Sequence, residues 1–189
     1  MSFKKRVCVY CGSKTGNNSS FIPQTKALGH ALASNKIGLV YGGGSVGLMN
    51  EIANATLSRG GQVHGVIPQH LYDMEVAHEN LTALHIPDTM HERKGMMAEL
   101  SDAFIALPGG FGTFEELMEA ITWLQLGIHK KTVIIFNIDG YYDKLIEFID
   151  EAVKNKFITE DNRSLLKTAN TIDECLHLLP FHGESSSRY

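Results

Sequence analysis

The chain has 189 residues, of which 43% are hydrophobic and 20% charged, and its formal net charge is −4. This composition argues against disorder, and the negative charge argues against a broad nucleic-acid-binding face. No apolar run reaches the roughly 18 residues of a membrane span, and no secretory signal pattern is present. We expect a cytoplasmic protein, without nucleic-acid or membrane partners, that folds as one nucleotide-binding domain over residues 1–180 with a flexible tail at 181–189.

Short apolar runs typical of strands alternate with segments of helical hydrophobic spacing. The predicted strands are residues 7–10, 38–41, 62–67, 81–86, 103–107 and 131–137. The predicted helices are residues 20–35, 48–58, 90–100, 112–126, 142–155 and 171–179, and residues 70–80 are predicted as a loop. This alternation predicts an α/β fold, a Rossmann-like open and mostly parallel sheet with helices on both faces.

The cysteines and histidines give no convincing metal or redox site. Cys8 and Cys11 have C-x-x-C spacing, but they lie in an apolar strand-like run, and alternation places them on opposite faces. With Cys175 the count is odd, which fits a reducing compartment better than a disulfide framework. None of the nine histidines has H-x-x-x-H or H-E-x-x-H spacing. We therefore expect no metal and no cofactor.

Three glycine-rich segments each follow a predicted strand. They contain Gly12 and Ser13, then Gly43 and Gly44 within residues 42–47, and finally residues 108–113. The carboxyl ends of parallel strands share one edge, so the three loops should lie along one rim. Glycines there either serve tight turns or let a phosphate approach the backbone, and three such loops favour the phosphate. No dinucleotide or P-loop fingerprint is present, which indicates a mononucleotide.

Glutamates follow the third glycine-rich segment. Thr113 and Glu116 have the T-x-x-E spacing of a capping box, which favours a structural role for Glu116 by spacing alone. Glu115 and Glu119 are its acidic neighbours. The positive end of the helix dipole should keep a first-turn carboxylate ionised, which suits charge stabilisation or general-base catalysis.

Two adjacent cations, Arg93 and Lys94, lie near the start of the predicted helix 90–100. They are either a solvated charge run or anion ligands. Because the helix dipole disfavours cations at a helix N-terminus, their position invites a functional explanation.

Four motifs in this order resemble those of the Lonely Guy (LOG) family of cytokinin riboside 5′-monophosphate phosphoribohydrolases, whose members were often labelled lysine decarboxylases. They are VYCGS at 9–13, VYGGGSVGLM at 40–49, MHERK at 90–94 and PGGFGTFEE at 108–116. The resemblance covers residues 6–179. It implies hydrolysis of the N-glycosidic bond of an adenine-type nucleoside 5′-monophosphate, either a cytokinin nucleotide or AMP, to the free base and ribose 5-phosphate.

The resemblance also implies the residues of the site. Arg93 and Glu116 match the catalytic positions, and the residues leave open whether Arg93 contacts Glu116 or the sugar-phosphate. The substrate-binding positions are Glu75, Lys94, Gly110, Phe111, Gly112, Thr113, Glu115 and Thr122. Phe111 stands where plant members commonly have tyrosine, so a hydrogen bond made by that hydroxyl would be missing here.

Two other functions compete with this interpretation. A lysine decarboxylase needs pyridoxal phosphate and a Schiff-base lysine, and no lysine here is marked for that role. A non-enzymatic carrier of a nucleotide or of molybdenum cofactor would share the fold and the glycine loops. The pair Arg93 and Glu116 favours the hydrolase, because a carrier needs no such pair.

The predicted helix 112–126 has apolar residues around more of its circumference than one core contact requires. They are Leu117, Met118, Ile121, Trp123, Leu124 and Leu126. The helix is either buried on nearly all sides within one subunit or shared between the sheet and a twofold-related copy. The resemblance implies the second arrangement, a homodimer in which the partner completes each active site.

Overall fold

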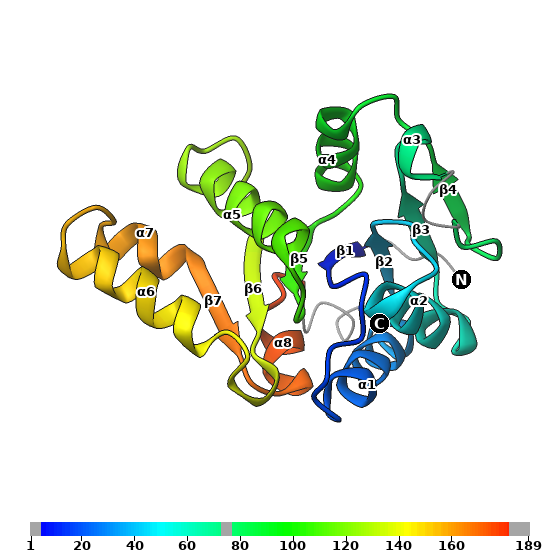
Figure 1. The fold of residues 1–189 in the computed structure, drawn as a ribbon, viewed down its shortest axis with the longest axis horizontal. Helices are drawn as coiled ribbons and strands as arrows, with labels where there is room; N and C mark the ends of the chain where they lie inside the picture. The colour runs from blue at the N-terminus through cyan, green and yellow to red at the C-terminus, as the bar shows by residue number, and fades with distance from the viewer. Residues whose placement is uncertain (1–4, 73–76, 182–189) are drawn as a thin grey trace, which may run out of the picture.

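A computed structural model describes residues 5–72 and 77–181. Its centre is a seven-stranded sheet of order β4-β3-β2-β1-β5-β6-β7, in which every neighbouring pair is parallel (Figure 1). The strands are β1 (Lys5–Tyr10), β2 (Ile37–Tyr41), β3 (Val63–Val66), β4 (Ala83–His85), β5 (Ala103–Ala106), β6 (Thr132–Phe136) and β7 (Leu166–Ala169). The fold class predicted from the sequence is confirmed.

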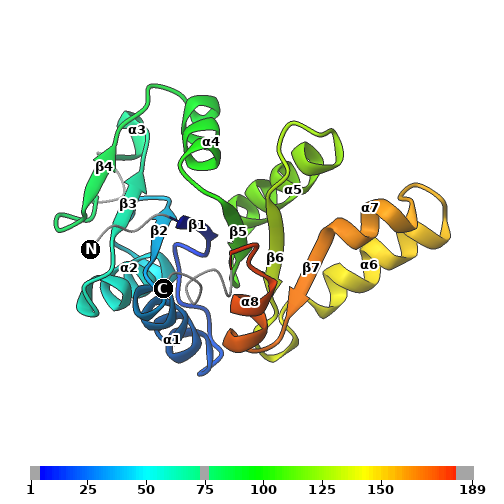
Figure 2. The same ribbon diagram turned by 180° about the vertical axis from the view of Figure 1, so that it is seen from behind.

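Helices cover both faces of this sheet. They are α1 (Phe21–Ser34), α2 (Gly47–Ser58), α3 (Gln69–Tyr72), α4 (Met90–Glu99), α5 (Phe111–Gln125), α6 (Asp143–Lys154), α7 (Glu160–Leu165) and α8 (Ile172–Leu178), with a 3₁₀ turn at Ile138–Gly140. One apolar cluster joins the sheet to α1, α2 and α8, and a second joins it to α4, α5 and α6. Figures 1 and 2 show α1 and α8 below the sheet and α4 and α5 above it.

The two apolar clusters also place the cysteines. Cys8 belongs to the α5 side of the sheet and Cys11 to the α1 side, as strand alternation predicts. Cys8, Cys11 and Cys175 are buried and free. Burial raises the pKa of the Cys11 thiol, which keeps it protonated and unreactive at neutral pH.

The last third of the chain holds elements that the sequence did not predict. Helix α7 and strand β7 lie between the predicted helices 142–155 and 171–179. β7 is an edge strand that pairs only with β6, and its central residues Lys167 and Thr168 are not buried. It therefore lacks the continuous apolar run of an interior parallel strand. Helix α3 likewise occupies part of the predicted loop 70–80.

The sheet order brings the three glycine-rich loops together. From β1 the chain builds outward through β2, β3 and β4, and then returns to place β5 on the other side of β1. The Gly12 N–H donates to the Pro108 carbonyl at 3.0 Å, and the Leu48 N–H donates to the Gly12 carbonyl at 3.0 Å. The loops after β1, β2 and β5 thus meet at the point where the strand order reverses, which is where open α/β sheets bind ligands.

The last described residue, Phe181, packs against the sheet and its helices. Phe181 lies against the cluster below the sheet, with the Lys5 ammonium 5.8 Å from its ring centroid. The remainder of the predicted tail, residues 182–189, lies outside the described residues, so the domain boundary stays a prediction. Among the described helices, none combines the length and apolar character that crossing a bilayer requires.

Candidate active site

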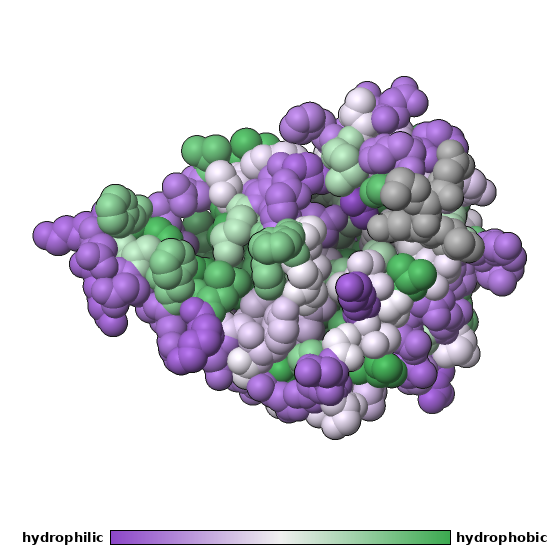
Figure 3. All heavy atoms as spheres, in the orientation of Figure 1, coloured by the Kyte–Doolittle hydropathy of each residue, from purple (hydrophilic) through white to green (hydrophobic). Residues whose placement is uncertain are grey.

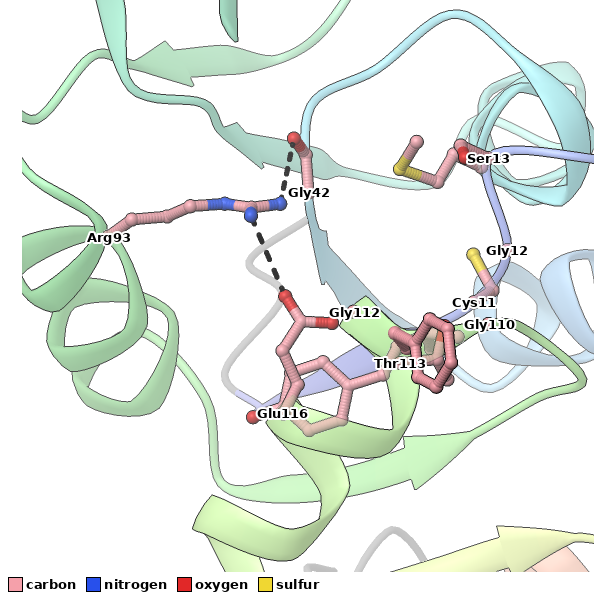
Figure 4. Close-up of a pocket in the computed structure, with 13 residues that line it drawn as sticks. Cys11, Gly12, Ser13, Gly42, Arg93, Gly110, Gly112, Thr113 and Glu116 are labelled. Atoms are coloured by element: carbon pink, nitrogen blue, oxygen red, sulfur yellow. Dashed lines mark hydrogen bonds and ion pairs between the residues drawn. The ribbon is translucent and has the colours of Figure 1, made fainter.

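A cavity of about 200 Å³ opens at the carboxyl ends of β1, β2 and β5 (Figure 4). It is lined by Val9, Tyr10, Cys11, Gly12, Ser13, Gly42, Met49, Arg93, Gly110, Phe111, Gly112, Thr113 and Glu116. The loop after β1 and the start of α5 therefore line the cavity as the sequence predicted. From the second loop it is Gly42 that lines the cavity. Gly43 and Gly44 turn away, since the Gly43 carbonyl accepts the His78 N–H at 3.2 Å and Gly44 pairs with Ala77.

Two glycines allow the loops to pack this closely. Gly47 has a φ of +56°, and a Cβ on it would lie 2.3 Å from the carbonyl carbon of Ser13. A Cβ on Gly109 would lie 2.0 Å from Oγ1 of Thr113. By contrast, a Cβ on Gly110 or Gly112 would meet nothing within 4 Å, because these two face the open cavity. The first pair thus serves loop packing, and the second leaves the backbone accessible to a ligand.

Arg93 reaches from α4 across the mouth of the cavity. Its Nε donates to the Val66 carbonyl at 3.0 Å, and its Nη2 donates to the Gly42 carbonyl at 3.4 Å. Its Nη1 lies 3.8 Å from Oε1 of Glu116, as the dashed line in Figure 4 marks. Arg93 therefore contacts Glu116 and holds the ends of two strands. The unfavourable interaction of a cation with the N-terminal end of the α4 dipole is offset because the guanidinium extends away from α4 and donates to two carbonyl oxygens.

The start of α5 differs from the capping box that the spacing predicts. The N-cap is Gly110, which offers no side-chain cap, and Thr113 lies inside the first turn with 3% of its surface exposed. Glu116 is consequently in the second turn, where its carboxylate faces Arg93 across the cavity. The capping hypothesis for Glu116 is wrong, because α5 begins at Phe111, earlier than the T-x-x-E spacing assumes.

The environment of Glu116 also changes the expected charge state. Its side chain is 12% exposed. Burial raises the pKa of the Glu116 carboxyl to about 7, against the opposing effect of the Arg93 guanidinium. The expectation of a carboxylate kept fully ionised by the helix dipole is therefore wrong. At neutral pH this group exchanges its proton readily, which suits general acid–base chemistry.

Lys94 lies outside the cavity and joins α4 to α5. Its Nζ lies 2.6 Å from Oε1 of Glu115 and 2.7 Å from Oε2 of Glu119. The Lys94 side chain is 12% exposed and that of Glu115 is 53% exposed, so the contact that joins the two helices is only partly shielded from solvent. Thr122 also lies away from the cavity, on the exposed side of α5, where its hydroxyl donates to the Met118 carbonyl at 2.7 Å.

A second cavity, of about 370 Å³, lies on the other side of Gly12 and Gly110. It is lined by Gly12, Ser13, Lys14, Thr15, Gly16, Phe21, Leu48, Pro108, Gly109, Gly110 and Tyr141. Lys14 is exposed there and forms no ion pair with any residue in the described ranges. Sequence reasoning missed Lys14, although its position directly after Gly12 and Ser13 was a usable signal.

Glu75 lies outside the described residues, and its predicted ligand contact stays a prediction. Within residues 5–72 and 77–181, no group of three or more His, Cys, Asp or Glu side chains is arranged to hold a metal ion.

These features define an α/β protein with glycine-rich loops and a buried arginine–glutamate pair at the carboxyl ends of its central strands. A family model described as "Possible lysine decarboxylase" matches residues 49–179. The chain is 47% identical over 188 residues to cytokinin riboside 5′-monophosphate phosphoribohydrolase LOG2 of Arabidopsis thaliana, covering 97% of this chain and 88% of the relative. It is 50% identical over 170 residues to the enzyme LOG of Oryza sativa subsp. japonica, covering 90% and 70%. The chain belongs to the LOG family, as its motifs indicated.

Solved structures resemble the fold at lower sequence identity. The molybdenum cofactor carrier protein of Chlamydomonas reinhardtii superposes with a TM-score of 0.70 at 20% identity, covering 92% of this chain and 94% of that chain. At this identity the likeness shows the shared fold alone.

Proposed function

We propose that this protein hydrolyses the N-glycosidic bond of cytokinin riboside 5′-monophosphate, releasing the free base and ribose 5-phosphate. The observation that carries the proposal is the Glu116 carboxyl, buried in a glycine-lined cavity with Arg93 at 3.8 Å. The names of the plant relatives support the same reaction. AMP shares the adenine nucleoside 5′-monophosphate core and is the simplest alternative substrate.

Cleavage of the bond between the ribose C1′ and the base builds positive charge on the sugar. An ionised Glu116 stabilises this charge from a largely buried position, and it accepts a proton from the attacking water as the C1′–oxygen bond forms. The electron pair of the broken bond stays with the base, which takes up a proton from solvent as it leaves, and Glu116 returns its proton to solvent. Arg93 fixes the orientation of Glu116 through their ion pair, and Lys94 fixes α4 against α5.

The start of α5 supplies the phosphate site. Its first N–H groups, at Phe111, Gly112 and Thr113, lack a side-chain cap and lie on the cavity wall. A phosphate bound there gains from these donors and from the helix dipole. Lys14 in the second cavity is the nearby cation that no carboxylate of the described residues neutralises. Holding the phosphate in place positions C1′ relative to Glu116.

The test is incubation with N6-isopentenyl AMP, AMP and adenosine, with chromatography for the released base. We expect release from the nucleotides and a loss of kcat/KM on the order of 2–4 kcal/mol for adenosine, which lacks the anchoring phosphate. Comparing the two nucleotides reports the N6 preference. Binding without turnover of any of them would favour the carrier function. Release of CO₂ from lysine would favour the decarboxylase, for which Lys94 is a poor candidate because two glutamates hold it.

The protein is further proposed to act as a homodimer. The structure describes every residue of α6, and none of them is buried, although apolar residues recur along this helix. Leu126, Ile128 and Phe148 are 65%, 63% and 71% exposed. Figure 3 shows hydrophobic side chains gathered over α5 and α6 on this side of the molecule. These exposed apolar side chains on one side support burial against a second copy, which would also use the exposed Thr122. A cytoplasmic location fits the three free cysteines.

A further inference from the structure

The loop between β5 and α5 has a hydrogen bond on each of its four successive carbonyls. The Leu107 carbonyl accepts the hydroxyl of Tyr142 at 2.7 Å, and the Gly109 carbonyl accepts the hydroxyl of Tyr141. The remaining two carbonyls are held by the backbone. The Pro108 carbonyl accepts the Gly12 N–H, and the Gly110 carbonyl accepts the Phe114 N–H, both at 3.0 Å.

These hydrogen bonds determine where the N–H groups of the loop point. In a planar trans peptide the C=O of one residue and the N–H of the next point in opposite directions. When Tyr141 holds the Gly109 carbonyl, the Gly110 N–H must point away from Tyr141. Gly110 lines both cavities whereas Tyr141 lines only the second, so this geometry favours the first cavity for the Gly110 donor. The bonds to the Pro108 and Gly109 carbonyls thus orient the N–H groups of Gly109 and Gly110. The Leu107 carbonyl precedes Pro108, which has no N–H, so its bond to Tyr142 fixes the start of the loop.

The two tyrosines are themselves well anchored. The Tyr142 ring is 1% exposed, and its backbone N–H donates to Oδ1 of Asn137 at 2.8 Å. Asn137 in turn donates to Asp143 at 2.7 Å. The Tyr141 ring packs edge-on against both Tyr142, with centroids 4.9 Å apart, and Phe21, at 5.5 Å. The hydroxyls are therefore held in place before any ligand arrives, which lowers the cost of ordering a glycine-rich loop.

We propose that Tyr141 and Tyr142 are positioning residues that preset the Leu107–Gly110 loop to bind the 5′-phosphate. The proposal rests on the proposed function, since it assigns the support of that phosphate site. The tyrosines act through the loop backbone, from a segment that lies after β6 and outside the family motifs used to recognise the chain. They are expected to influence phosphate binding and to leave the chemistry at C1′ unchanged.

The experiment compares Tyr141→Phe with the wild type, because Phe keeps the ring contacts and removes only the hydroxyl. We expect KM for AMP to rise about five- to tenfold with little change in kcat, and the inhibition constant of ribose 5-phosphate to rise by the same factor. The kcat/KM for adenosine, which has no phosphate, should stay at the wild-type value. A general structural defect would instead lower the turnover of adenosine and AMP together.

Two further variants complete the test. Tyr142→Phe should act in the same direction, and its melting temperature will show whether loss of this buried hydroxyl also weakens the fold. The matched control is Tyr41→Phe, because the buried hydroxyl of Tyr41 has no hydrogen-bond partner among the described residues. This variant should leave the KM for AMP and the inhibition constant of ribose 5-phosphate unchanged. An unaltered ribose 5-phosphate constant in a folded Tyr141→Phe overturns the inference. A wild-type protein that binds ribose 5-phosphate but releases no base overturns the proposed function alone.

Discussion

Gly42 and Arg93 are in such close contact that a methyl group on Gly42 would lie 2.5 Å from Nη2 of Arg93. The guanidinium lies directly over the end of β2, and this position lets Nη1 reach Glu116. The absence of a side chain at residue 42 is therefore a condition for the arginine–glutamate pair.

Replacing Gly42 with alanine should displace the Arg93 guanidinium and reduce kcat/KM for the nucleotide at least tenfold. Gly42 has no positive φ, so the backbone tolerates alanine and the melting temperature should change by only a few degrees. The control is Gly95→Ala on the same helix as Arg93, where a Cβ meets nothing within 4 Å. Wild-type kinetics in Gly42→Ala would show that the exact place of the guanidinium is unimportant.

Glu116→Gln should fold normally and lose at least about a hundredfold in turnover, because the amide neither stabilises the sugar cation nor accepts a proton. For the wild type, kcat/KM should rise with pH and level off above about pH 7, following the ionisation of this carboxyl. Base release measured between pH 5 and 9 checks both expectations. Glu51→Gln, which removes a carboxylate paired with Lys26, serves as the control. A fully active Glu116→Gln would remove Glu116 from the mechanism.

The same carboxyl should make stability depend on pH. Its pKa is raised from 4.5 to about 7 in the folded protein, so the folded state holds the proton more tightly than the unfolded state does. The resulting stabilisation is complete below pH 4.5 and is lost as the pH rises through 7. Between pH 5 and 8 the wild type should lose on the order of 3 kcal/mol relative to Glu116→Gln. Urea unfolding of both proteins at the two pH values measures this difference, and parallel pH profiles would contradict it.

Phe148→Glu should convert the proposed dimer into monomers and lower activity with it. Since the side chain is 71% exposed in the single chain, the change removes little internal packing, and charge at an apolar interface opposes association. Light scattering across a dilution series, paired with activity, provides the measurement. Ile86→Glu, at an exposed apolar residue on the β4 side of the sheet, should remain dimeric. A wild type that is monomeric and fully active at assay concentration would defeat the homodimer proposal.

The sequence predicted strands β1 to β6 and missed β7. Strands such as β1 and β6 are buried on both faces and are therefore continuous apolar runs. Strand β7 pairs on one side only and has polar central residues, so its sequence resembles a loop. β7 is stabilised by pairing with β6, more than thirty residues earlier in the chain, and its local pattern does not contain that information.

The sequence predicted some of the residues that line the cavity and fewer of the contacts between them. The motifs identified Arg93 and Glu116. The spacing of Thr113 and Glu116 suggested a capping box, because the true N-cap is a glycine, which has no side chain to indicate the start of the helix. That Arg93 contacts Glu116, and that Lys94 is held by Glu115 and Glu119, depends on how α4 packs beside α5. Tyr141 and Tyr142 reach the loop from more than thirty residues away, a distance at which spacing carries no signal.

The return of the chain from β4 to β5 has a consequence for synthesis on the ribosome. β1 is made first, yet one of its two neighbouring strands begins only at Ala103, and the contact from Arg6 to Asp102 closes a span of 96 residues. Until that segment leaves the exit tunnel, the nascent chain carries β1 with one edge unpaired and its apolar side chains exposed. An exposed apolar strand edge is a template for pairing with another chain. This interval is the stage of biosynthesis at which a chaperone would protect the protein most.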